Sequence, residues 1–361
     1  MEIQKAGEGS TQIQAQNITI IQGIDEKRAR EIYDEKYGIA KRDLTEEAIK
    51  LANERVKILE ESLIPKIEAI DNGLKAFADP GFQLLLIQAQ KTAAATERPE
   101  DYDLLAELLV HRIKKGQDRK IRTGIHRAIE IIEDIPDDAL LGLTVLHAYN
   151  SFLPIANNCS EALDILDNLF QKVIYNELPE GEEWIDNLDI LDAIRVNPIG
   201  QFIKVEERYI KALENLLVIG IRKNSEEYNK AIQLLTSVGL PNNLLIDNQL
   251  CPGYVRLNLP TNTNLDEISL IMNLGSKIIP VPLNNFQKGI LAQIIDLYNK
   301  EPQLKKQVED NFKIEFQKRA NLMKLDGWIS KFKSSFNITA VGKVLAHANA
   351  QRCDKTLPPL N

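Results

Sequence analysis

The spacing of apolar and polar residues divides the chain into three stretches. Residues 7–23 alternate in the manner of an extended strand, and from Gly23 to about residue 240 apolar residues recur every three or four positions, as in amphipathic helices. After Leu240 prolines become frequent, and the segments 254–259 and 279–283 alternate again like half-buried strands. This pattern predicts a mainly α protein with a short N-terminal β-arm, a multi-helix bundle and a small C-terminal α+β domain of winged-helix-like type.

Breaks in the pattern predict four parts. Asp79-Pro80-Gly81 ends the first helical stretch, and the next change of texture follows Leu240. We therefore expect a β-arm over 1–23, long amphipathic helices over 24–78, a helical bundle over 79–240 and an α+β domain over 241–361. Pro65 should kink or split its helix, the stretch 182–195 should be helical, and 336–338 should add a strand.

The N-terminal arm is the predicted assembly device. Ile13 and Ala15 occupy one alternation register and Ile18 and Ile20 the other, so the strand should bend or turn between them. Strands this short are not stable alone in water and require a sheet from elsewhere. We predict that neighbouring copies supply it, giving a homo-oligomer of three or more chains. The alternatives are an arm folded on its own domain and a frayed tail.

Composition and charge narrow the class of protein. The 361 residues are 44% hydrophobic and 27% charged with a net charge of −8, which excludes a disordered polymer and opposes indiscriminate binding to nucleic acid or anionic membrane. The three cysteines are far apart, and no apolar run is long enough to span a membrane. We expect a cytoplasmic protein without membrane contact.

The sequence contains none of the common catalytic or ligand-binding motifs. The chain contains no phosphate-binding glycine loop, no HExxH and no GxSxG, and its four histidines are not spaced for zinc. We predict no catalytic residues, no metal site and no cofactor, and an enzyme is the less favoured class. His147, surrounded by apolar neighbours, is interpreted as a core histidine.

Residues 112–127, which we call the basic run, combine seven cations with a single acid, Asp118. These cations favour an anion or nucleic-acid site, whereas the alternative is a solvated corner that complements the C-terminus of the preceding helix. Arg119 and His126, with six residues between them, approach the Arg-x(4–6)-His spacing of HEPN-type ribonucleases but lack the polar residue that usually follows the arginine. The seven cations are Arg112, Lys114, Lys115, Arg119, Lys120, Arg122 and Arg127.

A second basic stretch covers 300–333 and is interleaved with aromatic residues. Basic and aromatic residues together are typical of single-strand binding. The rings recur every four residues, however, and this spacing indicates the buried face of two helices instead. The rings in question are Phe312, Phe316, Trp328, Phe332 and Phe336.

Two segments near the ends of the chain carry a family resemblance, GSTQIQAQNITIIQGI at 9–24 and NITAVGKVLAHANAQR at 337–352. Together they resemble a family of poorly characterised bacterial proteins found in defence islands, and the second is similar to that family's terminal Leu-Thr-x-x-Gly-x-x-(Ile/Leu)-Ala-x-Ala element. The tail Leu357-Pro358-Pro359-Leu360 departs from the family's aromatic finish.

The resemblance implies a self-assembling cytoplasmic protein in phage defence or stress. From it we expect a non-enzymatic oligomeric scaffold or sensor. A partner protein encoded nearby is left open as a further expectation. A nucleic-acid-binding module that uses the basic helices is the alternative, and a HEPN-like ribonuclease is a further one.

Overall fold

The computed structural model describes residues 24–41, 45–115, 118–261, 269–274 and 277–360. Contacts between residues divide the chain into two compact units, which we call unit 1, up to Lys114, and unit 2, from Lys115 onward. The predicted β-arm over 1–23 lies outside the described residues.

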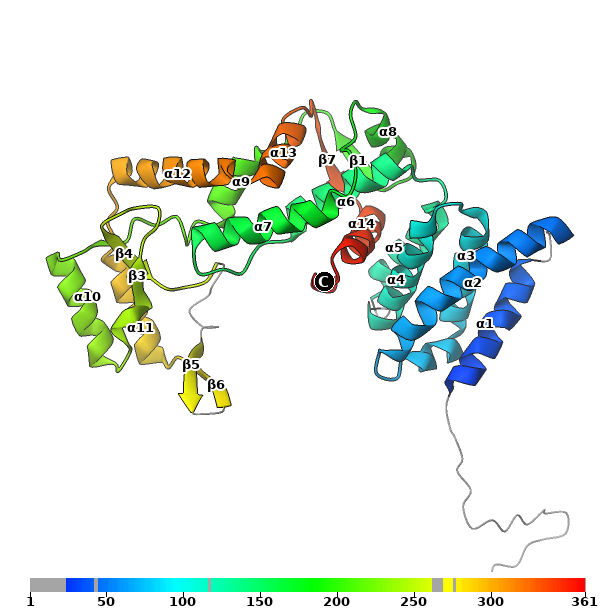
Figure 1. The fold of residues 1–361 in the computed structure, drawn as a ribbon, viewed down its shortest axis with the longest axis horizontal. Coiled ribbons are helices and arrows are strands. Elements are labelled where there is room, and N and C mark those ends of the chain that lie inside the picture. The colour runs from blue at the N-terminus through cyan, green and yellow to red at the C-terminus, as the bar shows by residue number, and fades with distance from the viewer. Residues whose placement is uncertain (1–23, 42–44, 116–117, 262–268, 275–276, 361) are drawn as a thin grey trace, which may run out of the picture. The chain divides into compact units, whose positions relative to one another are not determined.

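Unit 1 is helical, and its long helix α2 packs against α3, which also contacts α1 (Figure 1). Leu59, Leu63 and Ile67, each four residues apart on α2, are fully buried. This is the stripe that the apolar spacing predicts. The elements are α1 (Glu26–Ala40), α2 (Glu46–Glu68), the 3-10 helix η1 (Gly73–Ala78), α3 (Pro80–Ala95) and α4 (Pro99–Lys115).

Pro65 lies inside α2, in its last turn. The helix continues only to Glu68, and the chain resumes as η1 after Asn72, whose φ is 57°. Proline removes an intrahelical hydrogen bond, so a helix end shortly after it follows from its chemistry. The helical stretch predicted to continue to residue 78 is therefore divided between two elements, α2 and η1.

Unit 2 is built around α14, which packs on α5 and α6 (Figure 1). Helix α14 carries small and apolar residues on most sides, and Leu345, Ala346, Ala348 and Ala350 are fully buried. The helical elements of this part are α5 (Arg119–Ile131), α6 (Asp137–Ser151), α7 (Cys159–Val173), α8 (Glu183–Ile190), α9 (Val205–Ala212), α12 (Pro302–Gln317), α13 (Ala320–Ile329) and α14 (Ala340–Cys353).

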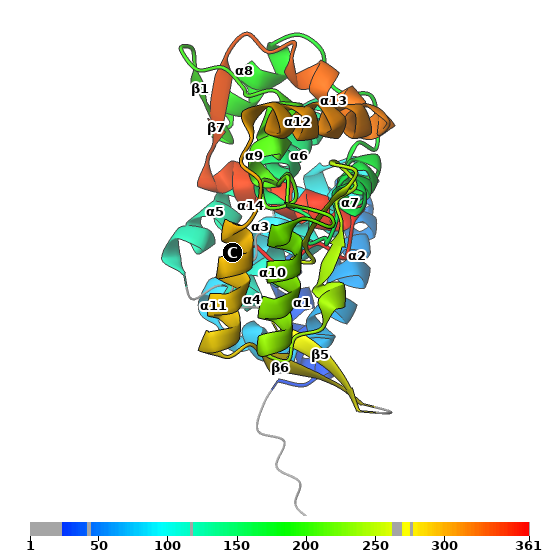
Figure 2. The same ribbon diagram turned by 90° about the vertical axis from the view of Figure 1, so that its left-hand side faces the viewer.

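A small α+β part of unit 2 has its own apolar core. The antiparallel sheet has strand order β2–β4–β3, and helices α10 and α11 lie side by side (Figure 2). Ile221, Leu235, Val255 and Ile294 belong to one buried cluster. The elements are β2 (Ile221–Arg222), α10 (Glu226–Ser237), η2 (Asn242–Leu244), β3 (Leu245–Asp247), β4 (Tyr254–Leu257) and α11 (Asn285–Asp296), with the hairpin β5 (Ser269–Leu274) and β6 (Lys277–Pro282) inserted before α11.

The predicted mainly α class, with few short strands in small sheets, is confirmed. The α+β part nevertheless begins at β2, before residue 241, and does not include the C-terminus. Strand β7 (Ser335–Ile338) pairs instead with β1 (Ile194–Asn197), in a segment that the pattern assigned to a helix over 182–195. The reason is that α8 ends at Ile190 and the next residues gain a strand partner about 140 positions away.

The aromatic rings of the second basic stretch belong to the core. Phe312 and Phe316 are fully buried or nearly so, and Trp328 and Phe336 are also buried. The four-residue spacing of Phe312 and Phe316 marks the buried face of α12, as predicted. The second predicted helical face is wrong beyond Trp328, because Phe332 follows the end of α13 and Phe336 lies on β7. Several lysines of this stretch are paired, for example Lys318 with Glu315 at 2.6 Å and Lys331 with Glu180 at 3.0 Å.

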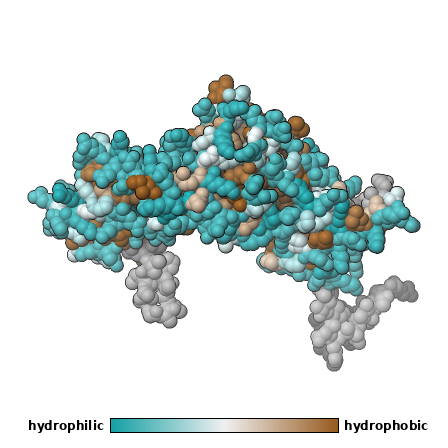
Figure 3. Space-filling model, turned by 45° about the horizontal axis from the view of Figure 1, so that its top comes forward, coloured by the Kyte–Doolittle hydropathy of each residue, from teal (hydrophilic) through white to brown (hydrophobic). Residues whose placement is uncertain are grey.

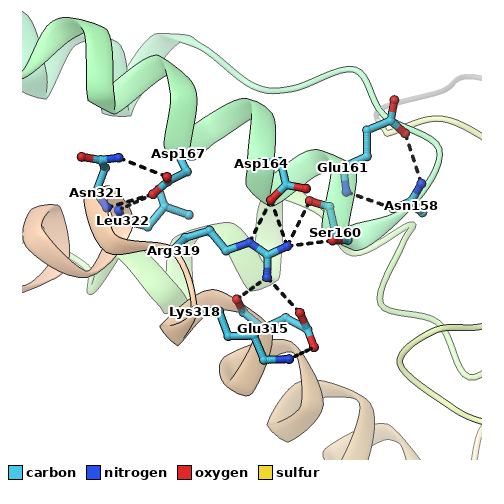
Figure 4. Close-up of polar contacts among 10 residues, drawn as sticks. All are labelled: Asn158, Ser160, Glu161, Asp164, Asp167, Glu315, Lys318, Arg319, Asn321 and Leu322. Atoms are coloured by element: carbon cyan, nitrogen blue, oxygen red, sulfur yellow. Dashed lines mark hydrogen bonds and ion pairs between the residues drawn. The ribbon is translucent and has the colours of Figure 1, made fainter.

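Arg319 joins the α12–α13 junction to α7 (Figure 4). Its guanidinium contacts Asp164 at 3.0 Å, Glu315 at 2.8 Å and the Ser160 hydroxyl at 2.7 Å. The Asp167 carboxylate accepts the backbone N–H groups of Asn321 and Leu322 at 2.8 and 3.2 Å, which caps α13 from the side of α7. Charge-assisted bonds of this kind fix how the two elements pack.

Candidate functional site

Helix α5 places three of the predicted cations, Arg119, Arg122 and Arg127, on one side. Asp118 caps its N-terminus by accepting the Lys120 N–H at 2.7 Å, and Ile125, Ala128 and Ile129 are fully buried on the opposite face. Packing of this apolar face leaves the other side of α5 open.

The open side of α5 forms one wall of a groove of about 710 Å³, which we call the α5 groove. Arg195 of β1 and the first turn of α14 form the facing wall. Four arginines and one histidine therefore share one cavity with two carboxylates. The charged lining residues are Arg119, Arg122, His126, Arg127, Glu130, Asp192 and Arg195.

Close packing brings the start of α14 into this wall. The Thr339 hydroxyl accepts the Gly342 N–H at 3.2 Å and donates to the Asp192 carbonyl at 2.6 Å, so the cap of α14 is fixed to the residues just before β1. A Cβ atom at Gly342 would overlap the Ala193 carbonyl oxygen, and one at Gly124 would lie 3.1 Å from the Ala340 carbonyl oxygen. Glycine at these positions permits α5, α14 and β1 to meet.

Some charges of the groove are neutralised by neighbours. Arg127 and His126 contact Glu130 at 3.0 and 3.3 Å, and Arg195 contacts Asp192 at 2.6 Å. All three basic side chains are about half exposed, so each pair contributes little to stability. The pairs leave these basic groups oriented and accessible.

Arg119 and Arg122 have no ion-pair partner among the described residues. Both lie in or beside the first turn of α5, where the helix dipole already places positive potential. A cation there destabilises the helix slightly. The Asp118 carboxylate at the same helix end accepts the Lys120 N–H as the cap and forms no ion pair with either arginine. The two guanidinium groups are thus available for an external anion, which they can bind with bidentate geometry.

The seven predicted cations are divided between the two units. Arg112 and Lys114 belong to unit 1, and the Arg112 guanidinium contacts Asp79 at 2.7 Å with only 14% of its side chain exposed. Lys114 and Lys115 close the C-terminal turn of α4, where cations are favourable. Lys120 is exposed on α5 but does not line the groove.

Sequence reasoning missed Arg195. It lies about 70 residues from α5, directly after a helix rich in acidic residues, and no spacing rule connects it to the basic segment. Only the pairing of β1 with β7, which is followed by α14, brings it to the groove. Ile13, Ala15, Ile18 and Ile20, the predicted assembly residues, lie outside the described residues.

His147 and His347 form a buried pair with 3.1 Å between their ring nitrogens, which confirms His147 as a core histidine. The Pro358 carbonyl lies 3.0 Å from His347 Nε2 and can only accept, so Nε2 donates to it. His347 Nδ1 then accepts from His147 Nε2, and His147 Nδ1 accepts from the Ser151 hydroxyl at 3.3 Å. Burial, with smaller effects of His347 and Lys343, lowers the pKa of His147 to about 3.

Two further kinds of site are absent from the described residues. Within the described ranges, no group of three or more His, Cys, Asp or Glu side chains is arranged to hold a metal ion. None of the helices in that part of the chain is both long and apolar enough to cross a membrane. On the face drawn in Figure 3, hydrophobic residues occur in small separate groups within a mostly hydrophilic surface.

These features define a mainly helical protein with a basic groove beside its central helix. A protein-family model with the description ":-like" matches residues 23–357, and the chain therefore belongs to that family. The description names no activity. No curated protein and no solved structure is detectably similar to the chain.

Proposed function

We propose that unit 2 binds the phosphate backbone of a nucleic acid in the α5 groove. The observation that carries this proposal is that Arg119 and Arg122, which have no ion-pair partner among the described residues, line the same cavity as Arg195. Phosphate contacts from arginine are the main source of affinity in sequence-independent binding. The overall charge of −8 opposes indiscriminate binding of nucleic acid over the rest of the surface.

The groove suits a single strand better than a duplex. A cavity of about 710 Å³ between a helix and a helix end accommodates a few nucleotide units, not the width of a double helix. The lining residues include no Phe, Tyr or Trp, so base stacking contributes little and phosphate pairing dominates. Binding should therefore depend steeply on salt and weakly on sequence.

The test is fluorescence anisotropy of a short labelled single-stranded RNA at low salt. The double variant Arg119→Ala/Arg122→Ala should weaken binding by at least about tenfold. Arg222→Ala/Lys230→Ala is the matched control, because it removes two exposed cations of unit 2 that lie outside the groove. Equal losses in the two variants, or binding to anionic vesicles without binding to nucleic acid, would rule the proposal out.

A second candidate is RNA cleavage of HEPN type. It is favoured by one observation, that Arg119 and His126, two helical turns apart on α5, line the same groove. Histidine is suited to remove the proton of a 2′-hydroxyl, and arginine to stabilise the phosphate in the transition state. His126→Ala should then abolish cleavage of the labelled RNA while leaving its binding nearly unchanged. RNA that stays intact with the wild-type protein contradicts this candidate.

The family resemblance adds a cellular setting to the proposal. We infer an oligomeric protein of the bacterial cytoplasm that acts in antiviral defence, assembled through Ile13, Ala15, Ile18 and Ile20, with a partner protein encoded nearby. Assembly would repeat the groove and so increase avidity for a long strand. Light-scattering mass of the full chain and of a version starting at Gly23 tests the assembly. A monomeric full chain contradicts it.

A further inference from the structure

A second cavity of unit 2 lies at the other end of α14 from the α5 groove. Its volume is about 950 Å³, and we call it the tail pocket because residues 354–358, after α14, line one side. The end of α6 with the following loop and one face of α7 complete it. The proposed binding of nucleic acid does not use this cavity.

The tail is held as a fixed wall of the pocket. The Pro358 carbonyl accepts from His347 Nε2 and from the Gln351 amide, both at 3.0 Å, and the Leu357 carbonyl accepts from Gln351 at 3.1 Å. Lys172 of α7 contacts Asp354 at 2.9 Å. Because these bonds are made without a ligand, the pocket is preformed, and binding would not have to order the tail.

Apolar side chains line one side of the tail pocket without being covered. Leu153 is 39% exposed, Ile155 81% and Ile165 41%. Partly exposed aliphatic residues that meet in a cavity, together with Phe152 and Leu357 of its lining, are typical of a site for an apolar ligand.

Carboxylates line the pocket beside the apolar residues. Glu161 and Asp164 lie three residues apart on α7, so both side chains project from one face. Asp164 Oδ1 contacts Arg319, and Glu161 Oε2 accepts from the Asn158 side chain (Figure 4). Glu161 Oε2 also accepts the backbone N–H of Asn157. The second oxygen of each carboxylate has no hydrogen-bond or ion-pair partner in the described part of the chain.

We propose that the tail pocket binds a small apolar molecule that carries one cationic nitrogen. The aliphatic residues would hold its apolar body, and Glu161 with Asp164 would bind the ammonium or guanidinium group. The charges of the lining favour a cationic ligand over an anionic one. Lys172 is already paired with Asp354, so it is not available to pair with an anionic ligand. An uncharged apolar ligand would place its surface against both carboxylates without supplying a cation to pair with them, which is unfavourable.

The test compares two probes with the same apolar chain, dodecylammonium and dodecanoate, below their micelle concentrations. Isothermal titration with the full chain should give at least about tenfold tighter binding of dodecylammonium. Glu161→Gln keeps an oxygen that accepts from Asn157 but removes the charge, and it should reduce this preference severalfold. Glu226→Gln, at the start of α10, is the matched control and should leave it unchanged.

A second variant addresses the apolar side. Ile155→Ser replaces the most exposed aliphatic residue of the pocket, so it should weaken dodecylammonium binding without unfolding the protein. Equal binding of both probes, binding of neither, or binding of dodecylammonium that Glu161→Gln and Ile155→Ser leave unchanged would overturn the proposal. Binding of a basic peptide in place of the small probe would overturn it as well.

Discussion

The two halves of the basic run 112–127 have similar composition and opposite structural positions. Arg112, Lys114 and Lys115 lie at the C-terminal end of α4, where cations stabilise the helix, and Arg112 is paired with Asp79. Arg119 and Arg122 lie at the N-terminal end of α5, where cations are unfavourable, and neither has an ion-pair partner among the described residues. Position relative to the helix dipole, not charge alone, separates structural cations from those available for a ligand.

The largest expected effect is a loss of stability in unit 2, which contains the α5 groove, from a substitution that does not touch α4. Gly342→Ala places a methyl group against the Ala193 carbonyl, which should destabilise unit 2 by about 3 kcal/mol. Urea unfolding measures this loss. Gly327→Ala on α13 is the control, because nothing lies within 4 Å of a Cβ atom there and a small gain in stability is expected. A Gly342→Ala protein as stable as the wild type would disprove the close contact.

Acidification should also weaken unit 2. The pKa of His147 is about 3 in the folded protein and about 6.5 when unfolded, so the unfolded state binds more protons between these values. The stabilisation is complete above pH 6.5 and decreases as pH falls, by about 2 kcal/mol near pH 5. Urea unfolding against pH shows this slope, and His147→Gln should remove this part of it. An identical slope in the variant contradicts the assignment.

Arg112→Ala should destabilise unit 1 by about 1 kcal/mol, because it removes a largely buried guanidinium from its pair with Asp79. Asp79 also caps α3, so its own orientation depends on this contact. Thermal unfolding provides the measurement. Binding of labelled RNA should not change, and a large loss of binding would place Arg112 with the ligand-binding cations instead.

The smallest expected effect has the opposite sign. Arg122→Ala removes a cation from the start of α5 and should stabilise the helix by a few tenths, about 0.3 kcal/mol, while RNA binding weakens. If Arg122→Ala gains stability and loses RNA binding, Arg122 contributes to the ligand site and not to the stability of the fold. Loss of both would indicate that Arg122 has a structural partner.

The sequence predicted much of the helical framework but only half of the candidate site. Three- and four-residue spacing located α2 and the buried rings of α12 and α13, because burial of one face sets that period. It could not show that Arg112 pairs with Asp79 or that Arg195 joins α5. Both depend on contacts between distant elements, and the β1–β7 pairing that positions Arg195 has no local sequence signal.

The most direct test of the central claim is the salt dependence of RNA binding for the two halves of the basic run. Each arginine that contacts a phosphate of a single strand contributes about 0.7 to the slope of log Kd against log salt. Arg119→Ala/Arg122→Ala should therefore reduce the slope by about 1.4. Arg112→Ala/Lys114→Ala should leave it unchanged. Equal reductions in both variants would contradict the account, because the α5 groove would then have no special role.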